Sequence, residues 1–99
     1  MTEREKNDIK LQLKDALSNE TEISKIIIFG SFLKTKEPND IDVAIFQDSK
    51  EIYLKLAMKY RKLTRDIARI LPVDIIPLKN NSSGNFLNEI LSGEIIYER

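Results

Sequence analysis

The sequence predicts a small α/β (α+β) domain in which helices pack on one face of a mixed β-sheet. Three short apolar stretches, 23–29, 41–46 and 73–78, have the length and composition of strands. A long helical pattern separates the second stretch from the third, which favours a parallel pair joined by a right-handed crossover. Only a short loop separates the first stretch from the second, which suits an antiparallel pair. The sheet should therefore contain both kinds of pairing.

The first helix is predicted over residues 3–18. Thr2 and Glu5 have the spacing of a capping box, and apolar residues then recur at helical intervals. These residues are Ile9, Leu13, Ala16 and Leu17. The stretch 23–29 that follows is rich in β-branched residues, which indicates an interior strand.

The second strand, 41–46, should present two different faces. Gly30 and Ser31 close the first strand, and we expect 32–39 to form a loop. Side chains alternate along a strand, so one face carries apolar residues for packing against helices and the other begins with two acids. The first set is Ile41, Val43 and Ile45, and the second is Asp40, Asp42, Ala44 and Phe46. We expect the second face to be comparatively open.

A long helix is predicted over about 50–70, with a capping box at 48–51. Its apolar stripe consists of Ile52, Leu56, Tyr60, Leu63, Ile67 and Leu71. Pro72 ends this helix. Beyond the third strand, a short helix around 86–91 should stop at Gly93 as its C-cap, and 94–98 should form a closing strand.

Composition limits the chemistry that is available. The 99 residues suit one domain, residues 1–99, and 16 basic residues balance 16 acidic ones, which argues against broad nucleic-acid binding. The absence of Cys and His excludes thiolate metal sites and Ser-His triads. The longest apolar run, 26–29, is too short for a membrane span, and the charged N-terminus is not that of a signal peptide. We therefore expect a cytoplasmic protein.

Three aspartates are the candidate functional residues. Asp40 and Asp42 lie two apart and should project from the same face of the second strand. Asp74 is the only acid in the apolar third strand, where an unpaired charge is costly. Neighbouring strands lie about 4.8 Å apart, so the three carboxylates would converge if the third strand pairs with the second. Taken singly, Asp40 is equally typical of a residue that ends a loop, and Asp42 and Asp74 are equally typical of partly exposed acids at a strand edge.

A cluster of three carboxylates favours a magnesium site. Like charges that close repel, and Mg²⁺ relieves the repulsion by accepting carboxylate oxygens together with water and phosphate oxygens. Two such ions, roughly 3.5–4 Å apart, orient an attacking hydroxyl and stabilise a leaving pyrophosphate.

The order of these residues resembles a known family. Gly30-Ser31, then Asp40-Ile41-Asp42-Val43, then Val73-Asp74-Ile75 are similar to the signature of the minimal nucleotidyltransferases. These belong to the DNA polymerase beta-like nucleotidyltransferase superfamily, and the resemblance covers nearly the whole chain. It implies the polymerase beta palm-like fold and the transfer of a nucleoside monophosphate, AMP from ATP above all, to a hydroxyl.

The resemblance also implies residue roles. Gly30 and Ser31 would hold the triphosphate of the nucleotide. Lys34 supplies a cation where the family has an Ala-Arg-Gly-like segment, and is a third candidate nucleotide-binding residue.

The same resemblance implies the metal and catalytic roles. Asp40 and Asp42 would hold both magnesium ions, and Asp74 would hold the catalytic ion and help to activate the acceptor hydroxyl.

The sequence defines the candidate partner less closely than it defines the candidate site. Larger nucleotidyltransferases add a helical domain for the acceptor, and we expect a second protein, or a second copy of this chain, to replace it here. In this family the second protein is often an all-helical HEPN toxin, which would make the chain its antitoxin. The alternatives are a binding module that neutralises its partner by contact, through a cationic helix face with Leu54 and Met58, and a stand-alone transferase acting on a small molecule or RNA.

Overall fold

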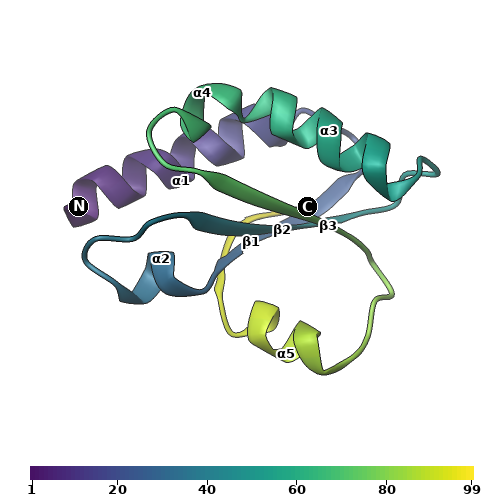
Figure 1. Ribbon diagram of the computed structural model, residues 1–99. Helices are drawn as coiled ribbons and strands as arrows, with labels where there is room; N and C mark the ends of the chain where they lie inside the picture. Colours follow the sequence, from purple (N-terminus) through teal and green to yellow (C-terminus); the bar gives the residue numbers. More distant parts are fainter.

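The computed structural model describes residues 1–99 and contains one four-stranded sheet (Figure 1). The elements in chain order are α1 (Glu3–Leu17), β1 (Ile23–Phe29), α2 (Ser31–Lys34), β2 (Ile41–Gln47), α3 (Tyr53–Leu63), α4 (Arg65–Ala68), β3 (Val73–Lys79), α5 (Asn85–Leu91) and β4 (Glu94–Glu98). None of the helices has the length and apolar character needed to cross a bilayer.

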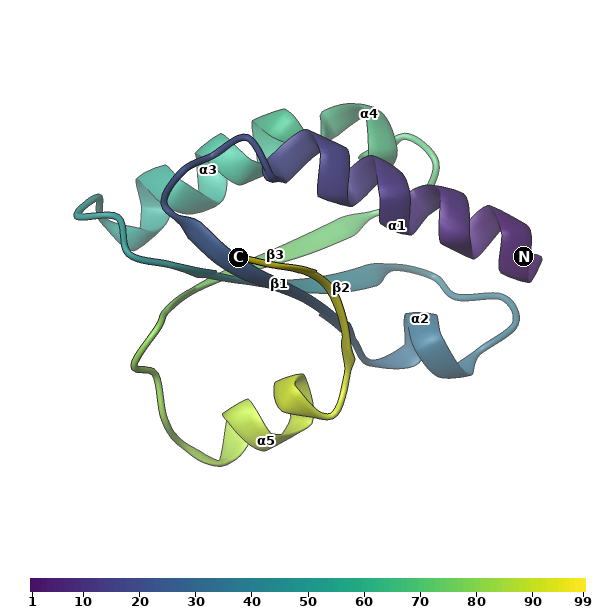
Figure 2. The same ribbon diagram turned by 180° about the vertical axis from the view of Figure 1, so that it is seen from behind.

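The sheet is mixed, as predicted. Its strand order is β3-β2-β1-β4. β1 pairs antiparallel with β2 on one side and with β4 on the other, whereas β2 and β3 run parallel. The crossover between β2 and β3 contains α3 and α4, which lie on the same side of the sheet as α1 in both views (Figures 1 and 2).

The main core lies between this helical layer and the sheet. The capping box of α1 is present: the Glu5 amide donates to the Thr2 hydroxyl at 3.1 Å, and the Thr2 amide donates to the Glu5 carboxylate at 2.9 Å. From α1, β1 and β2 the core includes Ile9, Leu13, Leu17, Ile23, Ile26, Ile28, Ile41, Val43 and Ile45. The predicted helix-facing side of the second strand is thus confirmed.

The other face of the sheet is partly covered, contrary to the expectation that helices pack on one face only. α5 lies across it (Figures 1 and 2). Ile90 of α5 packs there against a second, smaller group of buried residues, which are Ile27, Phe29, Ala44 and Phe46. The physical reason is that β1 is apolar at consecutive positions, so both of its faces need cover.

The predicted helix over about 50–70 is wrong in its bounds. Residues 48–52 are not helical. The Ser49 hydroxyl accepts a hydrogen bond from the Glu51 amide, and α3 begins only at Tyr53 without a side-chain cap. The helix is also interrupted at Thr64, whose hydroxyl donates to the Tyr60 carbonyl at 2.9 Å. Such back-bonding competes with regular helix geometry.

The expected apolar stripe of this helix is only partly buried. Leu56, Tyr60, Ile67 and Leu71 are buried, whereas Ile52 precedes the helix and is 63% exposed, and Leu63 is 39% exposed. The cations on the outer face of α3 differ in whether they form ion pairs. Lys59 is held by Glu20 at 2.7 Å and by Glu22 at 3.0 Å, whereas Arg61 and Lys62 form no ion pair.

Gly93 is required for a close approach between α5 and β1. The C-cap of α5 is Ser92 rather than Gly93, and Gly93 does not have the positive φ of a left-handed cap. A Cβ atom at Gly93 would lie 2.3 Å from the Ile28 carbonyl oxygen. The chain therefore enters β4 through a position that has no room for a side chain.

We predict that Gly93→Ala destabilises the fold by about 1–3 kcal/mol, the usual cost of overpacking. At roughly 4–8 °C per kcal/mol for a domain of this size, thermal unfolding followed by circular dichroism should show a clear fall in Tm. Ser83→Ala, at an exposed loop position, is the control and should leave Tm within a degree or two. Equal Tm values for Gly93→Ala and the wild type would contradict the close approach.

Candidate active site

Asp40, Asp42 and Asp74 come together at one end of the sheet. In the parallel pairing of β2 with β3, Asp42 is the register partner of Asp74. Asp40 lies just before β2, and one carboxylate oxygen from each of the three residues lies within 4.8 Å of the other two. The convergence that the sequence predicted is present, while the chemical role of the three aspartates remains a prediction.

The cluster is electrostatically strained without a counter-charge. Burial raises the pKa of Asp42, and the neighbouring carboxylates of Asp40 and Asp74 raise it further. Glu89 of α5 is close enough to contribute in the same direction. Because a raised pKa means that the charged form is disfavoured, the cluster costs stability whenever all of its members are ionised.

Gly30 is brought against this cluster by the end of β1. Its φ is +81°, in the region that favours glycine, and a Cβ atom there would lie 2.7 Å from Asp42 Oδ2. Any side chain at this position would therefore collide with the carboxylate. Gly30 is the N-cap of α2, so Ser31 begins that helix and is exposed beside the acids.

The expected loop over 32–39 begins instead with the single helical turn of α2. Phe32 is fully buried in the main core, and the Thr35 amide closes the turn by donating to the Ser31 carbonyl at 2.8 Å. Lys34, the third predicted nucleotide-binding residue, ends α2 and is exposed. No ion pair or hydrogen bond joins its side chain to the aspartates.

Lys6 is a positioning residue that the sequence interpretation missed. It is only 5% exposed, its Nζ donates to the Thr35 carbonyl at 2.7 Å, and its ammonium lies 5.5 Å from the centre of the Phe32 ring. It thereby fixes the segment that leads from α2 to Asp40. The signal was present in the sequence, since Lys6 is in helical phase with Ile9 and Leu13 of the apolar stripe.

The donor set fits magnesium. All three ligand candidates are carboxylates, the hard oxygen donors that Mg²⁺ binds. Asp74 is exposed while Asp40 and Asp42 are half-buried, so the cluster is open to solvent on one side. An ion together with a phosphate ligand can reach the acids from that side, and its charge would relieve the repulsion that raises the pKa of Asp42.

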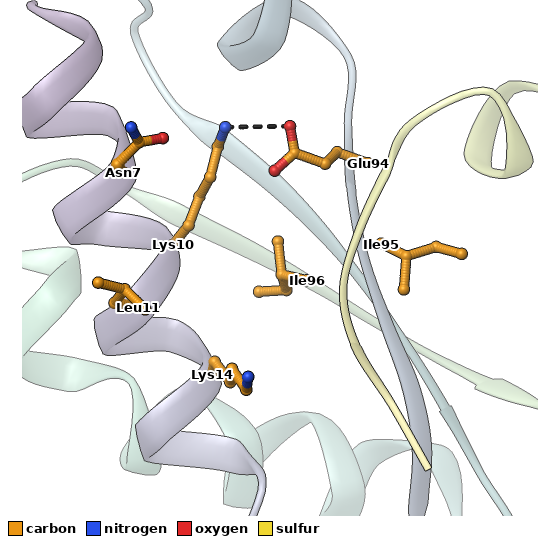
Figure 3. Close-up of a pocket in the computed structure, with 7 residues that line it drawn as sticks. All are labelled: Asn7, Lys10, Leu11, Lys14, Glu94, Ile95 and Ile96. Atoms are coloured by element: carbon orange, nitrogen blue, oxygen red, sulfur yellow. Dashed lines mark hydrogen bonds and ion pairs between the residues drawn. The ribbon is translucent and has the colours of Figure 1, made fainter.

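The pockets on the protein surface do not include the three aspartates. One of about 380 Å³ lies between α1 and β4 and is bordered by Lys14, Ile96 and the ion pair between Lys10 and Glu94, 3.1 Å long (Figure 3). It contains none of the three aspartates. β4 is at the opposite edge of the sheet from β3, so this hollow is separate from the acidic cluster.

Comparison with known proteins agrees with this geometry. The family model described as "Polymerase beta, Nucleotidyltransferase" matches residues 11–99. No curated protein matches the chain in sequence. A solved structure of a tri-AMPylated Shewanella oneidensis HEPN toxin in complex with MNT antitoxin is similar with a TM-score of 0.64 and 19% identity, over 95% of this chain and 73% of that one. A toxin-antitoxin structure with AMP-PNP is similar with a TM-score of 0.59 and 23% identity, again over 95% and 73%. At these identities the likeness shows a shared fold.

We predict that Asp42→Asn does not destabilise the metal-free protein at pH 7 and raises its Tm, because it removes a charge whose ionised form is disfavoured. A group with a raised pKa in the folded state stabilises that state at low pH, and this contribution is lost as the pH rises through the folded pKa. The gap in Tm between variant and wild type should therefore shrink as the pH falls from 7 towards about 4, the ordinary pKa of Asp. A lower Tm for Asp42→Asn across this range would show that the repulsion is not significant.

Proposed function

We propose that this chain, which belongs to the polymerase beta nucleotidyltransferase family, transfers AMP from ATP to a hydroxyl group of a HEPN-type toxin and so acts as its antitoxin. The observation that carries the proposal is the convergence of Asp40, Asp42 and Asp74 on one spot, beside the backbone of Gly30. Because the proposed substrate, ATP, and the proposed cofactor, Mg²⁺, are both abundant in the cytoplasm, we propose that the reaction takes place there.

In the proposed reaction the acceptor hydroxyl oxygen forms a bond to the α-phosphorus of ATP. The bond from that phosphorus to the bridging oxygen breaks, and pyrophosphate leaves. Asp40 and Asp42 would hold two magnesium ions. Asp74 would hold one of them and orient the acceptor hydroxyl, whose proton would pass to the Asp74 carboxylate. Bound magnesium would supply positive charge to the reacting phosphates. Gly30 and Ser31 hold the triphosphate, with Lys34 as an additional cation near its outer end.

The choice of acceptor rests on the similar structures. One of them contains an AMPylated HEPN toxin together with its MNT antitoxin, and another contains AMP-PNP. By analogy, we propose that the partner of this chain is a helical toxin whose hydroxyl group enters the open side of the cluster next to Asp74.

The proposal predicts label transfer. The chain, Mg²⁺ and ATP labelled on the α-phosphate should modify the co-purified product of the adjacent gene, as measured by gel autoradiography and mass spectrometry. Asp42→Ala should reduce the initial rate by about 10²–10³-fold, the range seen when one charge-stabilising group is removed from an active site.

Ser83→Ala is the matched control and should keep the wild-type rate, since Ser83 lies in an exposed loop. Transfer that is equally fast with Asp42→Ala, or no transfer by the wild type to any tested acceptor, would refute the proposed activity.

A second candidate function is neutralisation by contact alone, and the outer face of α3 favours it. Leu54 is 61% exposed and Met58 is 60% exposed, one helical turn apart. Arg61 and Lys62 follow without ion-pair partners. Adjacent exposed apolar side chains with free cations suit a partner that has an acidic, partly apolar surface.

The second candidate predicts that the double substitution Leu54→Glu with Met58→Glu weakens the complex with the partner at least about tenfold, as expected for the loss of central contacts. Binding can be measured by surface plasmon resonance without nucleotide. Leu11→Glu is the control, because Leu11 is equally exposed, at 58%, on a different helix. Undiminished binding by the double variant would exclude this face as the contact surface.

A further inference from the structure

An exposed aromatic ring lies on the face of the sheet that the acids occupy. Phe86 of α5 is 53% exposed. Its ring contacts the ring of Phe29 edge-on, with 6.2 Å between the centroids and 86° between the planes. The sequence predicted a short helix around 86–91, and Ile90 is the buried residue of that helix in the structure.

The position of Phe86 relative to the acids follows from the strand register. Phe29, at the end of β1, is the register partner of Asp42 in the antiparallel pair. Such partners have Cα atoms about 5 Å apart and side chains on the same face. Phe29 packs in the smaller core on the α5 side of the sheet, so Asp42 projects to that side as well. Phe86 therefore contacts Phe29, which is itself the cross-strand neighbour of Asp42.

Other contacts place the same side of α5 towards the acids. Glu89 lies one helical turn after Phe86 and acts on Asp42 electrostatically. Leu87 and Leu91 point the other way and border a separate hollow with Lys25 and Phe46. Phe46 is four residues along β2 from Asp42, which is about 13 Å at the rise of a strand.

We propose that Phe86 is the platform on which the base of the bound nucleotide stacks. This inference rests on the proposed function, since it takes the triphosphate to lie against Gly30 and the acids. Phe29 contacts the Phe86 ring edge-on, and about half of Phe86 remains exposed. A planar base can cover it, and a purine covers more of it than a pyrimidine does. Phosphates held at the acids leave the base to extend away from them, and the Phe86 ring offers an exposed aromatic surface on the same face of the sheet.

The first test distinguishes the contribution of the base to binding from that of the phosphates. Isothermal titration with Mg²⁺ present compares ATP with inorganic tripolyphosphate, which has no base. Phe86→Ala should weaken ATP binding about 5- to 150-fold, the range for loss of one base–aromatic stack, and leave tripolyphosphate binding unchanged. Leu91→Ala, at a residue that is 52% exposed on the opposite side of α5, should change neither affinity.

The second test uses the absence of tryptophan from the chain. Phe86→Trp keeps an aromatic platform and introduces the only indole. Its fluorescence should be quenched by ATP with Mg²⁺ and unaffected by tripolyphosphate with Mg²⁺. Leu91→Trp is the control and should respond to neither.

The outcomes distinguish this inference from the function on which it rests. If the wild type binds ATP and Phe86→Ala binds it equally well, the platform is wrong while the nucleotidyltransferase proposal stands. An equal loss of ATP and tripolyphosphate binding by Phe86→Ala would assign Phe86 a purely structural role and also overturn the platform. Failure of the wild type to bind any nucleoside triphosphate would refute both the platform and the proposed function.

Discussion

The parallel pairing of β2 with β3 is the constraint on which the site depends. In that register Asp42 lies opposite Asp74, and a shift by one residue would turn Asp74 to the other face of the sheet. The register is held by the buried crossover, in which Tyr60 and Ile67 pack over Ile41 and Val43 in the main core. Packing of the helical layer therefore holds the strands in the register that brings the acids together, despite the repulsion between their charges.

A cluster of like charges at the end of a sheet is stable only if the rest of the fold offsets it. The cost is concentrated at Asp42, whose neighbours on three sides are Asp74, Asp40 and the Gly30 backbone. Lys6 contributes indirectly: it is buried and ties the segment before Asp40 to α1. A bound cation would relieve this repulsion, because its positive charge favours the ionised form of the carboxylates.

The sequence was sufficient for the features that repeat a regular pattern. The lengths of the connections between the apolar stretches predicted the mixed sheet. Alternation along β2 and the isolated Asp74 in an apolar strand predicted the meeting of the three aspartates. It was insufficient where tertiary contacts decide local structure. The turn of α2 forms because Phe32 is drawn into the core. The capping box predicted at 48–51 is absent: the Glu51 amide donates to the Ser49 hydroxyl, and α3 begins only at Tyr53. The sequence interpretation also left the second face of the sheet open, although the apolar run 26–29 places side chains there that need burial and that α5 covers.

The central claim is that Asp40, Asp42 and Asp74 bind the metal of a nucleotidyl transfer site. The most direct measurement is a crystal structure of the chain with Mn²⁺ and a non-hydrolysable ATP analogue, with the anomalous signal used to locate manganese. The account predicts anomalous peaks in contact with all three carboxylates and with the phosphates of the nucleotide. Nucleotide bound elsewhere, or manganese absent from the three aspartates at saturating concentration, would contradict it.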